Sequence, residues 1–320
     1  MSHLLEVRDL NVCVKKNSKE LKILEKINFY IDKGEILGLA GESGCGKSMT
    51  ALSIASLLPK NVKITDGGVF YENIDLSSLS EKKICSIRGK KIAFIFQDVK
   101  QSLNPLMKAG KQITESIVLS GSKDKKQNKI KALELLNGLG FNEPEKIYNS
   151  FPHQLSGGMC QRVMTAIALI RRPGLLLGDE PSSSLDEESQ GICMSILKEM
   201  NRKHKMSLLI ISHDLSIIKE FADRFIIMYA GRIVEEGPSC AIESPLHPYT
   251  KALINASPDK NKRGKKLYSI PGRPPALEDK ISGCPFAPRC QKAQSICTES
   301  FPPLTETENR KVYCYFPEII

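Results

Sequence analysis

The sequence predicts an α/β fold, because short apolar segments typical of buried strands alternate with longer segments whose apolar residues recur at helical spacing. Several of the strand-type segments end in polar side chains, which in open α/β sheets gather at the edge where ligands bind. A chain of 320 residues, of which 41% are hydrophobic, can bury a large core and is long enough for one large or two ordinary domains.

The composition argues against several classes of protein. The longest apolar runs, 208–211 and 225–230, are far shorter than the roughly 20 residues that a membrane helix needs, and the N-terminus lacks the pattern of a secretory signal. We therefore expect a cytoplasmic chain without a membrane span. The net charge of +10 comes with basic segments at 123–129 and 260–266. No aromatic residues interleave them, which argues against nucleic acid as a partner and leaves anionic lipid headgroups as the alternative.

The first part of the chain is expected to form an antiparallel β flap. Residues 4–14 and 22–31 alternate apolar and polar side chains, which predicts two strands joined by a polar turn at 15–20. The flap leads into an apolar strand at 35–40, and a helix is expected from 49 to 58.

Between that strand and that helix, residues 41–48 read Gly-Glu-Ser-Gly-Cys-Gly-Lys-Ser and fit the pattern G-x-x-x-x-G-K-[ST]. Glycines let successive backbone N–H groups point at phosphate oxygens, and the start of the helix adds positive potential. Lys47 would reach the terminal phosphates and Ser48 would ligate Mg²⁺. The alternative, a glycine-rich turn with a solvent-facing lysine, loses weight once the downstream motifs are counted. The residues expected to bind the nucleotide here are Gly41, Ser43, Gly44, Cys45, Gly46, Lys47, Ser48 and Met49.

Two further stretches follow the loop in an order that favours site residues. A strand at 91–97 ends in Gln97 and is followed by a helical insertion at about 99–157. Ser156, Gly157 and Gly158 then open a helix, and small residues at a helix start leave backbone N–H groups bare for an anion. A solvated glutamine and an ordinary capped helix are the alternatives, and both are less favoured downstream of a phosphate loop.

Two adjacent carboxylates, Asp179 and Glu180, end an apolar strand that begins at residue 175. Asp179 is expected to hold the Mg²⁺ shell, and Glu180 to accept a proton from the attacking water or to orient it. The strand at 207–212 ends in His213, for which a contact to the γ-phosphate is favoured over a structural role in the core. The expected catalytic residues are Glu180, His213 and Gln97, and the expected Mg²⁺ ligands are Ser48, Gln97 and Asp179.

The order of phosphate loop, strand-end glutamine, Leu-Ser-Gly-Gly, apolar-Asp-Glu, Ser-Leu-Asp and strand-end histidine resembles that of the ATP-binding-cassette ATPases over roughly residues 4–240. The resemblance implies a P-loop cassette with a RecA-like core, an antiparallel β flap and a helical subdomain. It also implies ATP hydrolysis.

The resemblance further implies a head-to-tail dimer in which each ATP lies between two subunits. Ser156, Gly157 and Gly158 of one subunit would close on the ATP held by the phosphate loop of the other, with Asp186 at the interface. Gln97 would link the nucleotide state to membrane subunits.

A closer likeness is to the ATPase subunits of bacterial oligopeptide and dipeptide importers, and it is carried by residues 102–105, 228–232, 247–250 and 270–275. Residues 158–164 are similar to the D-type subunit, which implies an F-type ATPase partner, two permeases and an extracytoplasmic peptide-binding protein. The chain would then be a peripheral subunit at the cytoplasmic face of the inner membrane. Nickel importers are the near alternative, and a soluble cassette protein of translation or DNA repair is the alternative from another class.

The resemblance divides the chain into a cassette at 1–240, with a helical subdomain at about 99–157, and a C-terminal extension at 241–320. Two positions depart from the family pattern. Val14 stands where an aromatic residue usually stacks on adenine, and Gly178 stands where a larger residue usually precedes the aspartate. Neither departure removes a catalytic group, so hydrolysis is still expected.

The extension carries a second chemical signal, four of the ten cysteines, spaced C-x5-C-x6-C-x16-C. In a cytosolic chain, Cys284, Cys290, Cys297 and Cys314 suggest a metal site. The spacing is unlike the paired C-x2-C of structural zinc and suits a four-thiolate [4Fe–4S] cluster better. The tails of the importer family resemble such a site. Zinc, and plain thiols or a disulfide, are the alternatives. The other cysteines are expected to be small packing or surface residues: Cys13, Cys45, Cys85, Cys160, Cys193 and Cys240.

Overall fold

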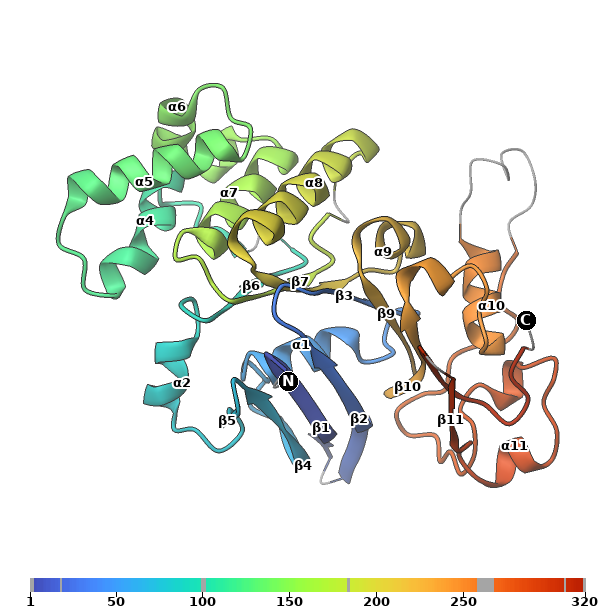
Figure 1. Ribbon diagram of the computed structural model, residues 1–320. Coiled ribbons are helices and arrows are strands. Elements are labelled where there is room, and N and C mark those ends of the chain that lie inside the picture. Colours follow the sequence, from blue (N-terminus) through green and yellow to red (C-terminus); the bar gives the residue numbers. More distant parts are fainter. Residues whose placement is uncertain are drawn as a thin grey trace. The chain divides into compact units, whose positions relative to one another are not determined.

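The computed structural model describes residues 3–17, 19–98, 102–182, 185–257, 268–307 and 309–318. The chain divides into two compact units (Figure 1). The first comprises Met1–Asp32, Ile36–Ser78 and Ile211–Ile320, and the second comprises Lys33–Glu35 and Leu79–Ile210.

The first unit contains the predicted β flap as a four-stranded antiparallel sheet. Its strands are β1 (Leu5–Lys16), β2 (Lys19–Ile31), β4 (Val62–Tyr71) and β5 (Ile74–Asp75), in the order β2-β1-β4-β5. The polar turn predicted at 15–20 is wrong in extent, because Lys15 pairs with Glu20 within the ladder. Polar side chains at an exposed ladder end stay in water, so they do not stop the strands from pairing.

The first unit also holds five strands in the order β11-β12-β10-β9-β3. The parallel pair β3–β9 lies at one end, and the remaining pairs are antiparallel. All five residues of β3 are buried, as its apolar sequence predicts. The C-terminal extension therefore adds strands to this sheet instead of forming a separate body. The bounds are β3 (Ile36–Ala40), β9 (Arg224–Tyr229), β10 (Arg232–Pro238), β11 (Leu304–Thr307) and β12 (Arg310–Tyr313).

Short helices complete the first unit. Helix α10 begins with His247 as its cap and Pro248 at the first position, where a missing N–H costs nothing. The helical elements described in this unit are α1 (Lys47–Ile54), α9 (Leu215–Phe221), η2 (Ser239–Ala241), α10 (Pro248–Ala256), η4 (Ala287–Arg289) and α11 (Ile296–Glu299).

In the second unit, β6 (Ile92–Ile95) pairs in parallel with β7 (Leu175–Asp179), and β8 (Ser207–Ile211) lies next to β7. Every residue of β7 and β8 is buried. The carboxyl ends of β6 and β7 therefore meet at one edge, which places Gln97 beside the strand-end carboxylates.

The second unit is otherwise helical, as the sequence predicts for the insertion. Helices α4, α5, α6 and α7 pack against one another (Figure 1). The helical elements described here are α2 (Glu81–Ile87), α4 (Ala109–Leu119), α5 (Lys125–Gly138), α6 (Pro144–Asn149), η1 (Pro152–Gln154), α7 (Gly157–Leu169) and α8 (Glu187–His204).

Helix α8 shows why these segments begin and end where they do. The carboxylate of Asp186 accepts the backbone N–H of Ser189 and caps the first turn. The last turn carries three basic residues, which favour the negative end of the helix dipole, and Lys205 then turns into the left-handed conformation with φ 53°. Within the described residues, none of the helices has the length and apolar character needed to cross a bilayer.

Candidate nucleotide site and cysteine pocket

The glycine-rich loop at 41–48 joins β3 to α1 in the first unit and depends on backbone conformations that favour glycine. Gly41, Gly44 and Gly46 have φ values of 152°, 80° and 107°. A Cβ at Gly41 would lie 2.2 Å from the carbonyl oxygen of Met228, and one at Gly46 would lie 2.6 Å from Leu24 Cδ2. The loop therefore needs glycine at these positions both for conformation and for space.

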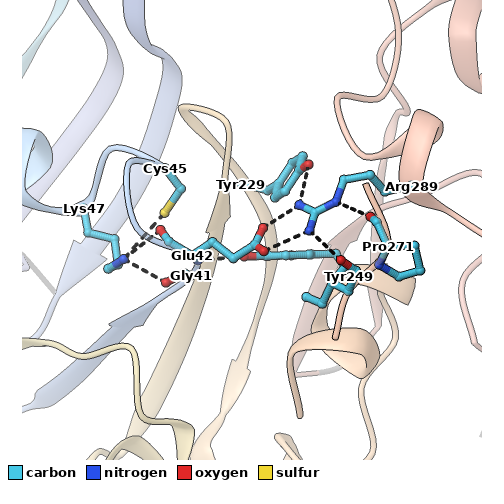
Figure 2. Close-up of polar contacts among 9 residues, drawn as sticks. Gly41, Glu42, Cys45, Lys47, Tyr229, Tyr249, Pro271 and Arg289 are labelled. Carbon is cyan, nitrogen blue, oxygen red and sulfur yellow. Dashed lines mark hydrogen bonds and ion pairs between the residues drawn. The ribbon is translucent and has the colours of Figure 1, made fainter. Parts of the chain in front are cut away.

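Lys47, the first residue of α1, is buried against its own loop (Figure 2). Its Nζ donates to the carbonyl oxygen of Gly41 at 2.8 Å and to that of Glu42 at 3.0 Å, and lies 3.8 Å from Cys45 Sγ. The ammonium group is thus held at the mouth of the loop by carbonyl groups that a phosphate can replace. Burial raises the pKa of the Cys45 thiol, which the charge on Lys47 only partly opposes, so this thiol is neutral.

The remaining loop residues leave the loop open to a ligand. Ser43 and Gly44 are exposed, and Ser48 and Met49 are half-buried. No side chain caps the start of α1, where Gly46 takes the left-handed conformation. Uncapped N–H groups at a helix start bind anions.

The C-terminal part of the first unit holds the loop at Glu42. Arg289 makes a bidentate ion pair with the Glu42 carboxylate, Nη1 to Oε2 at 2.6 Å and Nη2 to Oε1 at 3.0 Å (Figure 2). The backbone N–H of Glu42 donates to Tyr249 Oη at 2.8 Å. The remaining Arg289 donors reach Tyr229 Oη at 3.0 Å and the Pro271 carbonyl at 2.9 Å. Hydrogen bonding to Glu42 raises the pKa of Arg289, and burial raises that of Tyr249.

Sequence reasoning did not predict Arg289, Tyr229 and Tyr249 as parts of this site. The two tyrosines lie in segments that carry the importer resemblance, and Arg289 lies between the first two tail cysteines. A signal that could have found the arginine is its place in a short Cys-Pro-Phe-Ala-Pro-Arg-Cys segment.

In the second unit, the structure brings Gln97 and Glu180 together. Gln97 Nε2 donates to Glu180 Oε2 at 2.8 Å. Glu180 has a positive φ of 49°, an uncommon conformation for a residue other than glycine, and directly follows Asp179, which is buried at the end of β7. A strand-end amide thus contacts a strand-end carboxylate, a pairing that the sequence analysis did not predict.

The other predicted residues of the second unit lie at helix starts. Ser156 caps α7 by accepting the N–H of Met159, and Gly157 and Gly158 are the first two residues of that helix. Hydrogen bonds from Ser189 lower the pKa of Asp186, which caps α8. Ser183 and Ser184 of the Ser-Leu-Asp segment lie outside the described residues.

His213 lies in the first unit, two residues after the end of β8, and is exposed. The neighbouring Asp214 accepts the N–H of Ser216 and caps α9. Val14 and Gly178, the two departures from the family pattern, have local explanations. Val14 pairs with Leu21 and Val62 in the flap, and a Cβ at Gly178 would lie 3.2 Å from Pro181 Cγ.

The four tail cysteines line one small cavity of about 20 Å³ together with Phe286 and His247. All four are free thiols, so the disulfide alternative is not realised. Burial raises the pKa of Cys284 to about 11, and it also raises the pKa of Cys290 and Cys314, with the neighbouring thiols adding to each shift. Across the described part of the chain, no group of three or more His, Cys, Asp or Glu side chains has an arrangement that could hold a metal ion.

A glycine-rich phosphate loop on a buried parallel strand, with a buried lysine at its mouth, defines a P-loop ATPase of the α/β class. Comparison with known proteins identifies the family within this class. Residues 24–183 match the ABC transporter family, and residues 234–297 match the oligopeptide/dipeptide transporter C-terminal region.

Among curated relatives, the chain is 41% identical to the oligopeptide transport ATP-binding protein AppD of Bacillus subtilis, over 99% of this chain and 98% of the relative. It is 40% identical to the dipeptide transport ATP-binding protein DppD of Haemophilus influenzae, over 98% of this chain and 96% of the relative. Among solved structures, the ATP-binding cassette MJ0796, a dimer bound to ADP and Pi, matches with a TM-score of 0.67 and 29% identity, over 73% of this chain and 98% of that one. The chain belongs to the oligopeptide/dipeptide family of ABC transporter ATP-binding proteins, and it is an ATPase. The predicted family and fold class are therefore confirmed.

Proposed function

We propose that this chain binds and hydrolyses ATP to drive a membrane importer of dipeptides or oligopeptides. The observation that carries the proposal is that similarity to peptide-transport ATP-binding proteins extends through the C-terminal region, residues 234–297, and not only through the cassette. A soluble cassette protein of translation or DNA repair would not need this region.

Binding of ATP would use the loop of the first unit. Phosphate oxygens would accept the N–H groups at the start of α1, and Lys47 would exchange its bonds to the Gly41 and Glu42 carbonyls for bonds to phosphate. Ser48 and Asp179, with Gln97, would hold Mg²⁺, which supplies positive charge to the phosphates. The donor set fits this ion, because Mg²⁺ prefers hydroxyl, carboxylate and amide oxygens.

Hydrolysis would use the strand-end side chains. Glu180 would accept the proton of the attacking water, and Gln97 would orient its carboxylate through the 2.8 Å bond. His213 would contact the γ-phosphate. Ser156, Gly157 and Gly158 of a second cassette would complete the site, with Asp186 near the dimer interface.

The proposed assembly contains an F-type ATPase partner, two permeases and an extracytoplasmic peptide-binding protein, with this chain at the cytoplasmic face of the membrane. Residues 1–240 would form the cassette, with a helical subdomain at about 99–157, and residues 241–320 would form the extension. A nickel importer of the same family is the alternative cargo assignment.

The test is ATP hydrolysis and uptake by the reassembled importer in lipid vesicles. ATP hydrolysis that rises with a peptide-loaded binding protein, together with uptake of labelled peptide, is the expected result. Uptake of Ni²⁺ and not of peptide would show that the chain serves a nickel importer instead of a peptide importer. The Lys47→Ala variant is the control for ATP dependence.

For the cysteine pocket we propose a [4Fe–4S] cluster held by Cys284, Cys290, Cys297 and Cys314. Support comes from the four thiols around one cavity, which is the ligand set of such a cluster. Among the described residues no group of three or more His, Cys, Asp or Glu side chains is arranged to hold a metal ion, which supports neither zinc nor the cluster. Burial raises the pKa of Cys284, Cys290 and Cys314, so a cluster that binds them as thiolates would have to displace protons.

The cluster is tested on protein purified without oxygen, by iron, acid-labile sulfide and zinc analysis with a visible absorption spectrum. We expect about four irons and four sulfides per chain. Replacing the four cysteines with serine should abolish both, whereas replacing the exposed Cys85 and Cys240 should change neither. Protein with zinc or no metal would contradict the proposal.

A further inference from the structure

The phosphate loop contains one carboxylate, that of Glu42. Glu42 directly follows Gly41, and Lys47 contacts the carbonyl groups of both residues. A negative charge near the bound phosphates repels them, and the repulsion is stronger where water is partly excluded. The Glu42 side chain is only 23% exposed, so water screens it incompletely. Its charge therefore has to be compensated by the protein.

Arg289 supplies that compensation in a fixed geometry. Its side chain is 4% exposed and forms the two parallel hydrogen bonds to Glu42 that guanidinium and carboxylate groups match best. Further bonds to Tyr229 Oη and to the Pro271 carbonyl hold the guanidinium in place. Arg289 is therefore locked, and it turns the Glu42 carboxylate toward the extension (Figure 2).

The backbone of Glu42 is also held, by Tyr249 of the C-terminal extension and by Lys47 of the loop. Its N–H donates to Tyr249 Oη, and its carbonyl accepts Lys47 Nζ. The rings of Tyr229 and Tyr249 lie 4.5 Å apart, and Phe286 packs on both at 5.3 and 5.2 Å. One unbroken set of contacts thus runs from residues of the C-terminal extension through Glu42 to the phosphate-binding lysine.

We propose that Arg289 is a positioning residue for ATP binding: it neutralises Glu42 and fixes the phosphate loop, so that the C-terminal extension sets the affinity for nucleotide. The inference rests on the ATP site alone. It does not depend on the peptide cargo or on a cluster in the cysteine pocket.

The chain offers a matched pair for comparison. Arg310 donates to Glu235 at 2.6 Å, with side chains 10% and 0% exposed. Glu235 also accepts the N–H groups of Leu246 and His247, so this pair joins parts of the extension to β10. It has the chemistry of the Arg289–Glu42 pair, and among the described residues it has no hydrogen bond or ion pair with residues 41–48, so loss of Arg310 should affect stability alone.

The test is the dissociation constant for ATP of the full chain, measured by calorimetry for Arg289→Ala, Glu42→Gln, the double variant and Arg310→Ala. Arg289→Ala should weaken ATP binding about tenfold or more, because it leaves a carboxylate unpaired beside the phosphates. In the Glu42→Gln background the same substitution should cost less than about threefold, since the harmful charge is gone. Arg310→Ala should lower the melting temperature and leave affinity unchanged.

A role limited to folding of the tail gives a different pattern. The double variant would then bind ATP as poorly as Arg289→Ala, and Arg310→Ala would weaken binding as well; either result overturns the proposal. If Arg289→Ala does not fold, Arg289→Lys keeps the charge and loses the bidentate geometry. A several-fold weaker ATP affinity is then expected, and an unchanged affinity overturns the proposal. Because Arg289 adjoins Cys290, iron and sulfide content is also measured in each variant. It should equal that of the unmodified chain. Failure of the unmodified chain to bind ATP would instead contradict the nucleotide site itself.

Discussion

The phosphate loop and the Gln97–Glu180 pair are both candidate parts of ATP chemistry, and they are held in different ways. In the loop, Lys47 has two carbonyl partners, and Glu42 is fixed by two residues far along the chain, Tyr249 and Arg289. The Gln97–Glu180 contact is a hydrogen bond of 2.8 Å whose donor, Gln97, is exposed.

We infer from the difference that the proposed phosphate-binding residues are preorganised, whereas the exposed Gln97, one of the proposed catalytic residues, can readjust. A phosphate-binding loop must present its N–H groups before the ligand arrives, and rigidity lowers the cost of binding. A general base has to reach a water molecule that is positioned only in the closed site, so a weak contact is an advantage. The predictions below test this separation of roles.

The largest effect is expected for Glu180→Gln. The amide keeps the shape of the side chain but cannot accept a proton, so ATP turnover should fall about 100-fold or more while affinity is retained. Phosphate release by the reassembled ATPase measures the rate. Turnover at the normal rate would remove Glu180 from the role of base.

Lys47→Ala should have the next largest effect. Loss of charged hydrogen bonds to phosphate should weaken ATP binding about 10- to 100-fold, since each bond to a charged group contributes about 1.5–3 kcal/mol. Equilibrium binding of ATP measures this change. Lys63→Ala, which removes an exposed lysine paired with Glu20, is the control and should bind normally. Equal losses in both variants would show a nonspecific charge effect.

Gln97→Ala should lower turnover about tenfold and leave ATP affinity unchanged, because the Glu180 carboxylate loses an orienting partner but keeps its basicity. Steady-state rates at saturating ATP measure the effect. Unchanged turnover would mean that the 2.8 Å contact does not persist in the working enzyme.

Replacing a glycine by alanine should lower the free energy of unfolding more in the phosphate loop than in β7. Gly178→Ala should cost less than about 1 kcal/mol, because the new Cβ lies 3.2 Å from a side-chain carbon of Pro181, which can shift. Gly41→Ala should cost clearly more, because its Cβ would lie 2.2 Å from the backbone oxygen of Met228. Urea denaturation compares the two, and equal losses would contradict the idea that the loop is the more rigid region.

The sequence predicted site residues where their place depends on the local backbone conformation or on the end of a strand. Glycine at positions 41, 44 and 46 follows from the backbone conformation of the loop itself, so the pattern predicts the loop residue by residue. Strand ends predicted Gln97 and Glu180 in the same way, because parallel neighbouring strands bring their carboxyl ends together.

Contacts between residues far apart in the sequence were not predicted. Arg289 and Glu42 are 247 residues apart, and no local period relates an arginine in a tail segment to a carboxylate in a loop. The polar turn predicted at 15–20 was wrong because polarity marks exposure and not the end of pairing. The spacing of the tail cysteines suggested a shared site, and the four thiols do line one cavity, but spacing cannot determine what the cavity holds.

We infer that binding and hydrolysis of ATP depend on separately held sets of residues. The most direct measurement is the ATP dissociation constant together with the single-turnover rate at saturating ATP, for Lys47→Ala and Glu180→Gln side by side. The account predicts that the first variant loses affinity and the second loses rate while binding ATP normally. A Glu180→Gln variant that loses affinity as much as Lys47→Ala would contradict it.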